Sequence, residues 1–393
     1  MSDQKKQALK LAIAGFSSID MADAGILAGD SGLAIDKVYD ASDLSGGTIG
    51  EHDASRVSKD MVYGDAAANI LVGGGGNDIL VGGGGGDALR GGGGENWAAY
   101  HNAPAGVTAS LAMPEFNTGD AAGDSYSNIQ SLIGSRFRDV LTGTALNNRL
   151  AGANGDDDLF GLGGLDTLYG GGGTDRLDGG AGADRLFGGA GNDTLLGGDL
   201  TVPSGDTARE TLNGGDDLDI IFAGARRETI NGGTNAGGVD VLSYFFSTTG
   251  VTVDLQAGTG TGGFAAGDTI ADIEGVSGSS RADTLLGSLR DDILEGAGGN
   301  DTLTGRGGSD TFWYDLTIVE GSLPTIGNDI ITDFDVRNGT SDPAFDQLFF
   351  DNAGDQFQQV TATQSGADTV LTSALFVGSI TLRNFDADQW MQF

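Results

Sequence analysis

The sequence of 393 residues contains no cysteine and only two histidines. The lack of cysteine excludes disulfides, thiolate zinc sites and cysteine nucleophiles. His52 and His101 both lie outside any H-E-x-x-H motif, so a histidine-rich metal site is excluded as well. No segment approaches 18 consecutive apolar residues, and we therefore expect no transmembrane segment.

Positive charge is also scarce. Lys and Arg total 20 against 56 acidic residues, the formal net charge is −36, and no lysine follows Lys59. A nucleic-acid-binding protein needs a basic surface, so this class is excluded. The acidic residues are 48 Asp and only 8 Glu, and Asp favours turns, where its short side chain holds the carboxylate close to the backbone. The 72 glycines argue against a conventional helical or sandwich core.

The glycine and aspartate residues form a nine-residue repeat. Seven units follow one another without a break from Gly134 to Leu196, beginning GSRFRDVLT and ending GGAGNDTLL. The eighth place is always Leu, and the sixth place is Asp in six units and Asn in one. Four further units occupy residues 64–99 and four occupy 278–313, while residues 197–244 follow the same register loosely. A fixed short period indicates a stacked, solenoid architecture.

Glycine-rich loops of the form GGxGxD followed by a short apolar strand resemble the RTX, or hemolysin-type, calcium-binding nonapeptide repeat. The resemblance covers most of residues 64–313. It implies an all-β fold, a parallel β-roll or β-helix in which two units make one turn. Loops eighteen residues apart would then face each other, which pairs Asp139–Asp157, Asn148–Asp166, Asp157–Asp175, Asp166–Asp184, Asp175–Asp193, Asp283–Asp301 and Asp292–Asp310.

Calcium is the cation that such loops would hold. Each strand is too short to be stable alone, and stacking would align the Leu residues into one core and the carboxylates into rows that repel one another. Calcium accepts six to eight oxygen ligands, including backbone carbonyls that glycines can aim inward. The predicted ligands are Asp78, Asp87, Asp139, Asn148, Asp157, Asp166, Asp175, Asp184, Asp193, Asp219, Asp283, Asp292, Asp301 and Asp310.

The alternative interpretation is that these aspartates only form turns in a solvated acidic linker. It has more weight for the degraded loops at Asn69, Asn96, Glu210 and Glu228 than for the central block.

Three regions are expected. Residues 1–62 form an N-terminal cap with a short amphipathic helix carrying Leu9, Ile13 and Phe16. Residues 63–313 form the solenoid, with repeat blocks 64–99, 134–243 and 278–313. Residues 314–393 form a C-terminal β cap that resembles the C-terminal region of RTX proteins and, by that resemblance, carries a type I secretion signal.

Two inserts, at about 100–133 and 244–277, separate the repeat blocks. Residues 97–168 and 241–312 are identical at about 27 of 72 places at a constant offset of 144, which indicates a tandem duplication. We expect each insert to be a wider turn of the same solenoid.

Several function classes find no support. No G-x-S-x-G, H-E-x-x-H or P-loop motif is present, so we expect no enzyme. Two further classes are not expected. A pore-forming toxin would need a long apolar region before the repeats, and an ice-binding face would need a regular outward row of Thr. The sequence shows neither feature. The alternative that stays open is a calcium-dependent β-solenoid that binds or modifies polysaccharides, like the epimerases and lyases, with His101 as its one candidate catalytic residue.

The sequence therefore predicts a secreted, calcium-binding RTX protein with a structural or adhesive role, extracellular or associated with the cell surface. Its expected partners are calcium ions, the type I secretion apparatus, and either further copies of itself or a surface polysaccharide. Outward-facing Tyr169 and Phe187 would stack at eighteen-residue spacing. This pair is either an interaction face or a ladder that only stabilises the roll.

Overall fold

The computed structural model describes residues 37–39, 48–50, 59–198, 208–235, 238–316, 323–335, 346–351 and 360–385. The described part contains no α-helix; its helical turns are the 3-10 helices η2 (Pro114–Phe116), η3 (Gly119–Ala121) and η4 (Gly263–Ala265). None of these helices has the length or the apolar composition needed to cross a membrane. The helix expected around Leu9, Ile13 and Phe16 lies outside the described residues.

The chain divides into two compact units, one comprising Met1–Gly197 with Asn213–Asp216 and the other Gly198–Leu212 with Asp217–Phe393. Strand β18 (Arg209–Asp216) carries the chain across this division.

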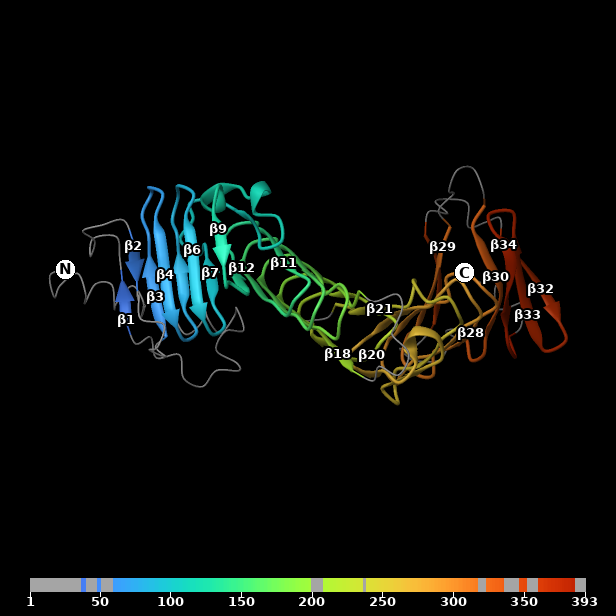
Figure 1. Ribbon diagram of the computed structural model, residues 1–393. Coiled ribbons are helices and arrows are strands. Elements are labelled where there is room, and N and C mark those ends of the chain that lie inside the picture. The colour runs from blue at the N-terminus through green and yellow to red at the C-terminus, as the bar shows by residue number, and fades with distance from the viewer. Residues whose placement is uncertain are drawn as a thin grey trace. The chain divides into compact units, whose positions relative to one another are not determined.

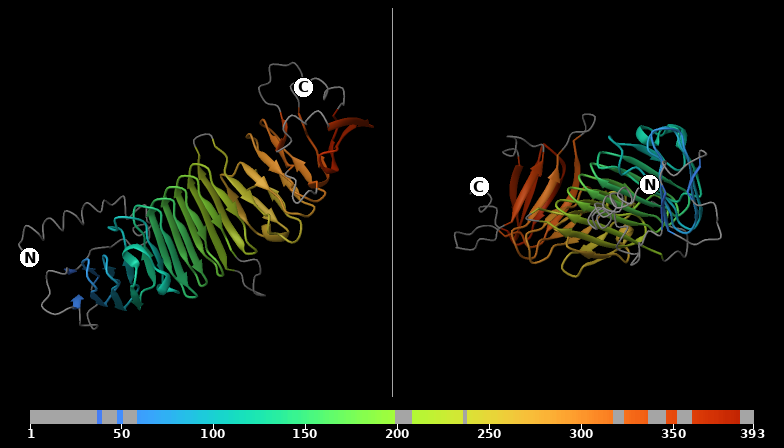
Figure 2. Two further views of the ribbon diagram at one scale, coloured as in Figure 1. Left: turned by 90° about the horizontal axis from the view of Figure 1, so that it is seen from above. Right: turned by 90° about the vertical axis from the view of Figure 1, so that its left-hand side faces the viewer.

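The first unit consists of parallel ladders of short strands that lie side by side like rungs (Figures 1 and 2). One ladder joins β1 (Lys37–Tyr39), β3 (Asp60–Tyr63), β5 (Ile79–Val81), β7 (Trp97–Ala99), β10 (Ser131–Ile133), β12 (Arg149–Asn154), β14 (Thr167–Gly172) and β16 (Arg185–Ala190). A second joins β8 (Thr108–Ser110), β11 (Val140–Thr144), β13 (Asp158–Leu162), β15 (Arg176–Asp178) and β17 (Thr194–Leu196). A third joins β2 (Thr48–Gly50), β4 (Ile70–Gly75), β6 (Ala88–Gly93) and β9 (Ser125–Ser127).

The ladders explain why leucine recurs in the eighth place. Leu141 pairs with Leu159 and Leu159 with Leu177, a register of eighteen residues, so two repeats make one turn. All seven eighth-place leucines of the central block have no exposed surface. Because the middle residue of each strand points inward, these side chains form one continuous core in this unit. The β-roll expected from the sequence is confirmed.

Some strands are longer than the three residues expected from the repeat. β12, β14 and β16 each run six residues, because their glycine-rich ends continue the pairing, as Gly171 does opposite Ala153 and Gly189. Loop residues that lack bulky side chains can approach closely enough to extend the ladder.

The second unit has the same plan. Its main ladder joins β19 (Ile220–Phe222), β21 (Val241–Ser243), β25 (Gly275–Ser277), β27 (Ile293–Glu295), β29 (Thr311–Asp315) and β31 (Gln347–Asp351). Another joins β22 (Thr252–Asp254), β26 (Thr284–Leu286), β28 (Thr302–Thr304), β30 (Thr325–Ile331) and β34 (Val377–Leu382). β20 (Arg227–Thr234) pairs with β24 (Thr269–Ala271). Antiparallel pairing adds β23 (Thr259–Thr261) between β22 and β24, and β32 (Val360–Ser365) and β33 (Asp368–Ser373) beside β34.

Each insert contributes strands to the ladders of its own unit. In the first unit β8, β9 and β10 pair with β11, β6 and β7. In the second, β22, β24 and β25 pair with β26, β20 and β21. This pairing is the arrangement expected of inserts that form wider turns of the roll.

Candidate metal site in the repeat loops

The carboxylates of the sixth place form buried stacks. In each of the seven pairs expected from the sequence, the backbone N–H of the earlier residue donates to Oδ1 of the residue eighteen positions later, at 2.7–3.0 Å. The fourteen predicted ligands are at most 3% exposed. The structure thus brings the expected pairs together, one above the other on successive turns.

Further aspartates extend these stacks and were not predicted as ligands. Asp124 accepts the N–H of Asp87, and Asp268 accepts the N–H of Glu228, both from within the inserts. Other members are Asp60, Asp240, Asp329 and Asp346. The signal for Asp124 and Asp268 was the AAGD segment that both inserts share. It was missed because the loops around it are longer than nine residues.

The second carboxylate oxygen separates two kinds of loop. Loops of the form G-x-x-G-x-D are here called glycine loops. Oδ2 is buried and accepts no hydrogen bond in six of them, at Asp78, Asp87, Asp157, Asp166, Asp175 and Asp301. Burial, foremost, and then the neighbouring carboxylates raise the pKa of Asp157 and of Asp301 to about 8. Burial also raises the pKa of Asp166 and of Asp175 to about 7.

The first glycine of each loop provides the space beside that oxygen. A Cβ added at Gly152 would lie 2.2 Å from Asp157 Oδ2 and 2.7 Å from the carbonyl oxygen of Gly170 on the next turn. The same arrangement recurs at Gly161 and Gly170. A carboxylate oxygen and a carbonyl oxygen from two turns therefore meet where any other residue would place a side chain.

Glycine loops also adopt a left-handed backbone at their second place. The φ angle there is +117° at Gly171, and it stays positive where the residue is not glycine: +87° at Ala153, +75° at Leu162 and +62° at Ala297. A left-handed backbone is energetically unfavourable for a residue other than glycine, so the surrounding structure must impose this conformation. In this conformation the second-place N–H does not bond to the carboxylate.

The other kind of loop has Ser or Thr in the second place and is called a hydroxyl loop here. Its members are Ser135, Thr144, Ser279 and Ser288, and none has a positive φ. In each, the N–H and the hydroxyl donate to the sixth-place side chain of the same loop, Asp139, Asn148, Asp283 and Asp292 respectively. Burial still raises the pKa of Asp283, but the bonds from Ser279 oppose the shift.

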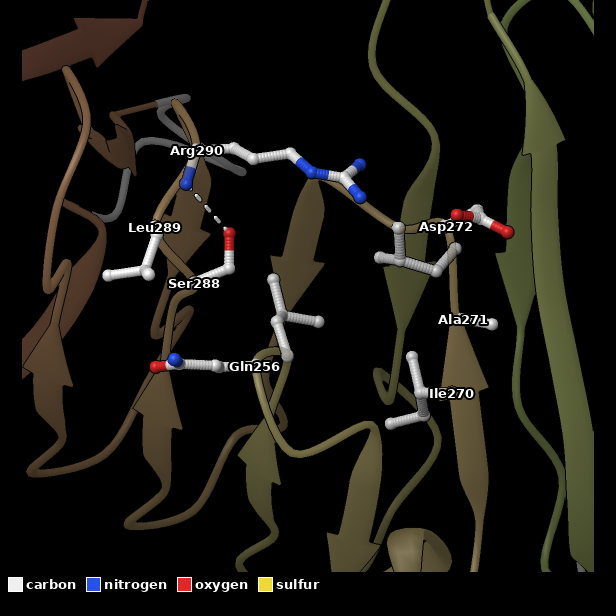
Figure 3. Close-up of a pocket in the computed structure, with 9 residues that line it drawn as sticks. Gln256, Ile270, Ala271, Asp272, Ser288, Leu289 and Arg290 are labelled. Atoms are coloured by element: carbon white, nitrogen blue, oxygen red, sulfur yellow. Dashed lines mark hydrogen bonds between the residues drawn. The ribbon is translucent and has the colours of Figure 1, made fainter.

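Figure 3 shows one hydroxyl loop, where the Ser288 hydroxyl also accepts the N–H of Arg290 at 3.0 Å. A pocket of about 240 Å³ lies beside it, lined mainly by apolar residues such as Leu255, Ile270 and Leu289. Arg290, which also lines this pocket, forms an ion pair with Glu274, with 3.4 Å between Nη1 and Oε1. The pocket lining therefore differs from the oxygen-rich glycine loops.

The glycine loops fit calcium better than other metals. Among the described residues no three His, Cys, Asp or Glu side chains converge on one point, so backbone carbonyls must complete any metal site. A hard cation that accepts carboxylate and carbonyl oxygens in flexible geometry is calcium, whereas zinc prefers nitrogen or sulfur and magnesium requires strict octahedral geometry. Calcium would supply the positive charge that balances carboxylate oxygens without a hydrogen-bond donor, such as Asp157 Oδ2.

Comparison with known families agrees with this chemistry. Four copies of the RTX calcium-binding nonapeptide repeat match residues 63–98, 133–168, 169–199 and 277–312. No curated protein matches the chain. The chain therefore carries four copies of the RTX calcium-binding repeat, and it carries them on a parallel β-roll that stacks their carboxylates.

Proposed function

We propose that this is a secreted RTX protein whose glycine loops bind extracellular calcium and that it folds when they do. The bare, buried Oδ2 atoms of the glycine loops carry this proposal. A buried carboxylate oxygen without a partner destabilises the fold unless a proton or a cation compensates it. Calcium is the cation that fits the oxygen-rich cradle beside Gly152, Gly161 and Gly170.

Folding and binding are coupled in this proposal. Without calcium, a chain with 72 glycines and a net charge of −36 has a large ordering entropy and strong self-repulsion, both of which favour an extended state. That state suits export through a type I secretion apparatus. Outside the cell, calcium at about 10⁻³ M would occupy from about half to about nine-tenths of sites with the affinities of extracellular modules, about 10⁻⁴–10⁻³ M.

The role that we propose after folding is structural or adhesive, at the cell surface or in an extracellular matrix. The repeats and their inserts make up most of the described residues, and a stacked roll presents long rows of side chains to a partner. The alternative is a polysaccharide-binding or polysaccharide-modifying β-solenoid. His101, its one candidate residue, is partly buried, and burial lowers its pKa to about 4. A neutral imidazole in that position does not favour acid catalysis.

A calcium titration of the full, EDTA-stripped chain tests the proposal. We expect a cooperative transition from coil to β by circular dichroism, and contraction from the radius of gyration of about 70 Å expected for an unfolded chain of this length. Magnesium at the same concentration is the control and should produce neither change. A chain that stays folded and compact after chelation would show that the carboxylate rows do not depend on calcium.

A further inference from the structure

The two insert regions, residues 100–151 and 244–295, satisfy their buried carboxylates without a metal. In the first, Tyr100 is buried and its hydroxyl donates to Asp124 Oδ2 at 2.8 Å, while the hydroxyl of Ser135 donates to Asp139 Oδ1 at 2.9 Å. Asp124 Oδ1 accepts the N–H of Asp87. Both oxygens of Asp124 therefore have protein donors.

The second region repeats this arrangement 144 residues later. The buried hydroxyl of Tyr244 donates to Asp268 Oδ2 at 2.9 Å. Ser279, which has no exposed surface, donates its hydroxyl to Asp283 Oδ1 at 3.0 Å and its N–H to Oδ2 at 2.7 Å. The N–H of Val251 completes the set at Asp283 Oδ1, as the N–H of Val107 does at Asp139.

The duplication retains these donors while much around them differs. Only about 27 of 72 places are identical between the copies, yet both tyrosines, both serines and all four of their aspartates are the same. Thr144 becomes Ser288, which keeps the hydroxyl. By contrast, Tyr126, which lies 2.6 Å from the Tyr100 hydroxyl and accepts from Asn117 in the first copy, is replaced by Ile270.

We propose that residues 100–151 and 244–295 fold without calcium, because Tyr and Ser hydroxyls take the place that the cation takes in the glycine loops. The proposal rests on the proposed function, since it needs the glycine loops to be calcium-dependent. The proposal divides the predicted ligands into a group that binds no calcium and a group that binds it. Asp139, Asn148, Asp283 and Asp292 hold their loops through Ser or Thr and bind no calcium, whereas Asp157, Asp166, Asp175 and Asp301 bind it.

The two regions then act as folded starting points for the neighbouring glycine loops. Each repeat block that follows an insert begins with two hydroxyl loops, at Ser135 and Thr144 and at Ser279 and Ser288. The strand of an ordered turn can pair with the strand of the next turn. The first folded turn, whose formation is the unfavourable nucleation step, is then already present before calcium binds.

Hydrogen–deuterium exchange of the full chain in EDTA at neutral pH tests this directly. Peptides from 100–151 and 244–295 should stay protected, while peptides from 152–196 should exchange like an unfolded chain and gain protection only with calcium. Equal, fast exchange in all three segments would overturn this inference but leave the proposed function intact. Protection of all three in EDTA would overturn both.

A substitution at Ser279 tests the hydroxyl itself. Ser279→Ala removes one donor to a buried carboxylate, and exchange across 275–295 in EDTA should accelerate by about tenfold or more. Ser280→Ala is the matched control, because Ser280 is exposed, and it should leave exchange unchanged. If the two variants behave alike, the Ser279 hydroxyl does not substitute for a cation.

Discussion

At the scale of the residue, the aspartate of the sixth place has two oxygens in different environments. Oδ1 accepts a backbone N–H from the preceding turn, as Asp157 does from Asp139 at 2.8 Å, and this bond sets the register of the stack. In the glycine loops Oδ2 faces the space beside the first glycine and accepts no hydrogen bond, as at Asp157. The stack therefore forms through one oxygen and is destabilised through the other, which is the property expected of a ligand-dependent fold.

Asparagine in the sixth place shows how a neutral side chain resolves this conflict. Asn148 Nδ2 donates to the carbonyl of Gln130 at 2.8 Å, and Asn96 Nδ2 donates to the carbonyl of Asn128 at 3.0 Å. At Asn96 the amide keeps the acceptor that sets the register, because its Oδ1 accepts the N–H of Asp78 at 2.9 Å, and it supplies a donor where aspartate has a bare oxygen.

We expect Asp157→Asn to have opposite effects with and without calcium. In EDTA at pH 8 the variant should be more folded than the wild type, because it removes a buried charge without removing Oδ1. In a calcium titration its folding midpoint should rise about tenfold, equivalent to about 1.4 kcal/mol. Circular dichroism measures both.

Asp156→Asn is the matched control for this prediction. Asp156 is the exposed neighbour, and its Oδ1 accepts the N–H of Thr174, which an amide oxygen can also do. It should leave both quantities close to the wild type. A calcium midpoint that moves equally in both variants would mean that only net charge matters, and that Asp157 is not a ligand.

At the scale of the element, the glycine loops and the hydroxyl loops differ in the conformation of their second residue. In the glycine loops Gly, Ala, Leu or Arg in that place takes a positive φ, and Oδ2 stays bare where that residue is Gly, Ala or Leu, as at Asp175, Asp157 and Asp166. Ser or Thr keeps an ordinary φ and bonds to the carboxylate. The choice is local, but it decides whether the loop needs a cation.

Leu162 is a site where this conformation is costly. Its φ is +75°, and it is 45% exposed, so it contributes little to the core. Leu162→Gly should raise the free energy of unfolding in saturating calcium by about 1 kcal/mol, since glycine adopts this region without penalty. Chemical denaturation measures the change. Leu165→Gly, at an exposed place without positive φ, should not stabilise the protein, and a gain there would contradict the explanation.

The expected aromatic ladder is present. The rings of Tyr169 and Phe187 are stacked, with centroids 5.0 Å apart and an interplanar angle of 10°, on paired places of β14 and β16. We expect Tyr169→Ser and Phe187→Ser to be coupled by about 0.5–1.5 kcal/mol in a double-mutant cycle, and to leave self-association unchanged. Sedimentation of the double variant decides between ladder and interface: lost assembly with an unchanged calcium midpoint would favour the interface.

At the scale of the whole molecule, many raised pKa values add up to one pH dependence. The metal-free fold holds Asp157 and Asp301 with pKa values of about 8, and Asp166 and Asp175 with values of about 7, against an ordinary 3.8. A raised folded-state pKa means that the fold takes up protons. Its stability is then full below pH 4 and decreases as the pH rises towards 8.

Acidification in EDTA should therefore promote folding. We expect the β signal of the metal-free chain to increase between pH 8 and pH 5, where protons replace calcium on the bare oxygens. With saturating calcium the dependence should reverse, because protons compete with the cation for the same oxygens. A metal-free chain that is equally unfolded at both pH values would show that carboxylate repulsion is not what opposes folding.

Individual residues show how far the sequence could predict this fold. The period of nine identified Leu141 and its successors as core residues, because it depends on spacing along the chain. The pairing of Asp139 with Asp157 came from the resemblance to the RTX repeat, which implies two units in each turn. Asp124 and Asp268 were missed, since they enter the stacks 37 and 40 residues after their partners, across turns that spacing alone does not measure.

The composition and the repeat by themselves determined a stacked solenoid with a leucine core and rows of carboxylates, because these follow from short-range periodicity. The parallel β-roll with two units in each turn was implied by the resemblance to the RTX repeat. Only the tertiary structure decided which carboxylates the inserts add to the stacks and what donates to them. Asp124 and Asp268 receive the hydroxyls of Tyr100 and Tyr244 from 24 residues away. Such contacts arise when distant segments meet in space, so no local pattern contains them.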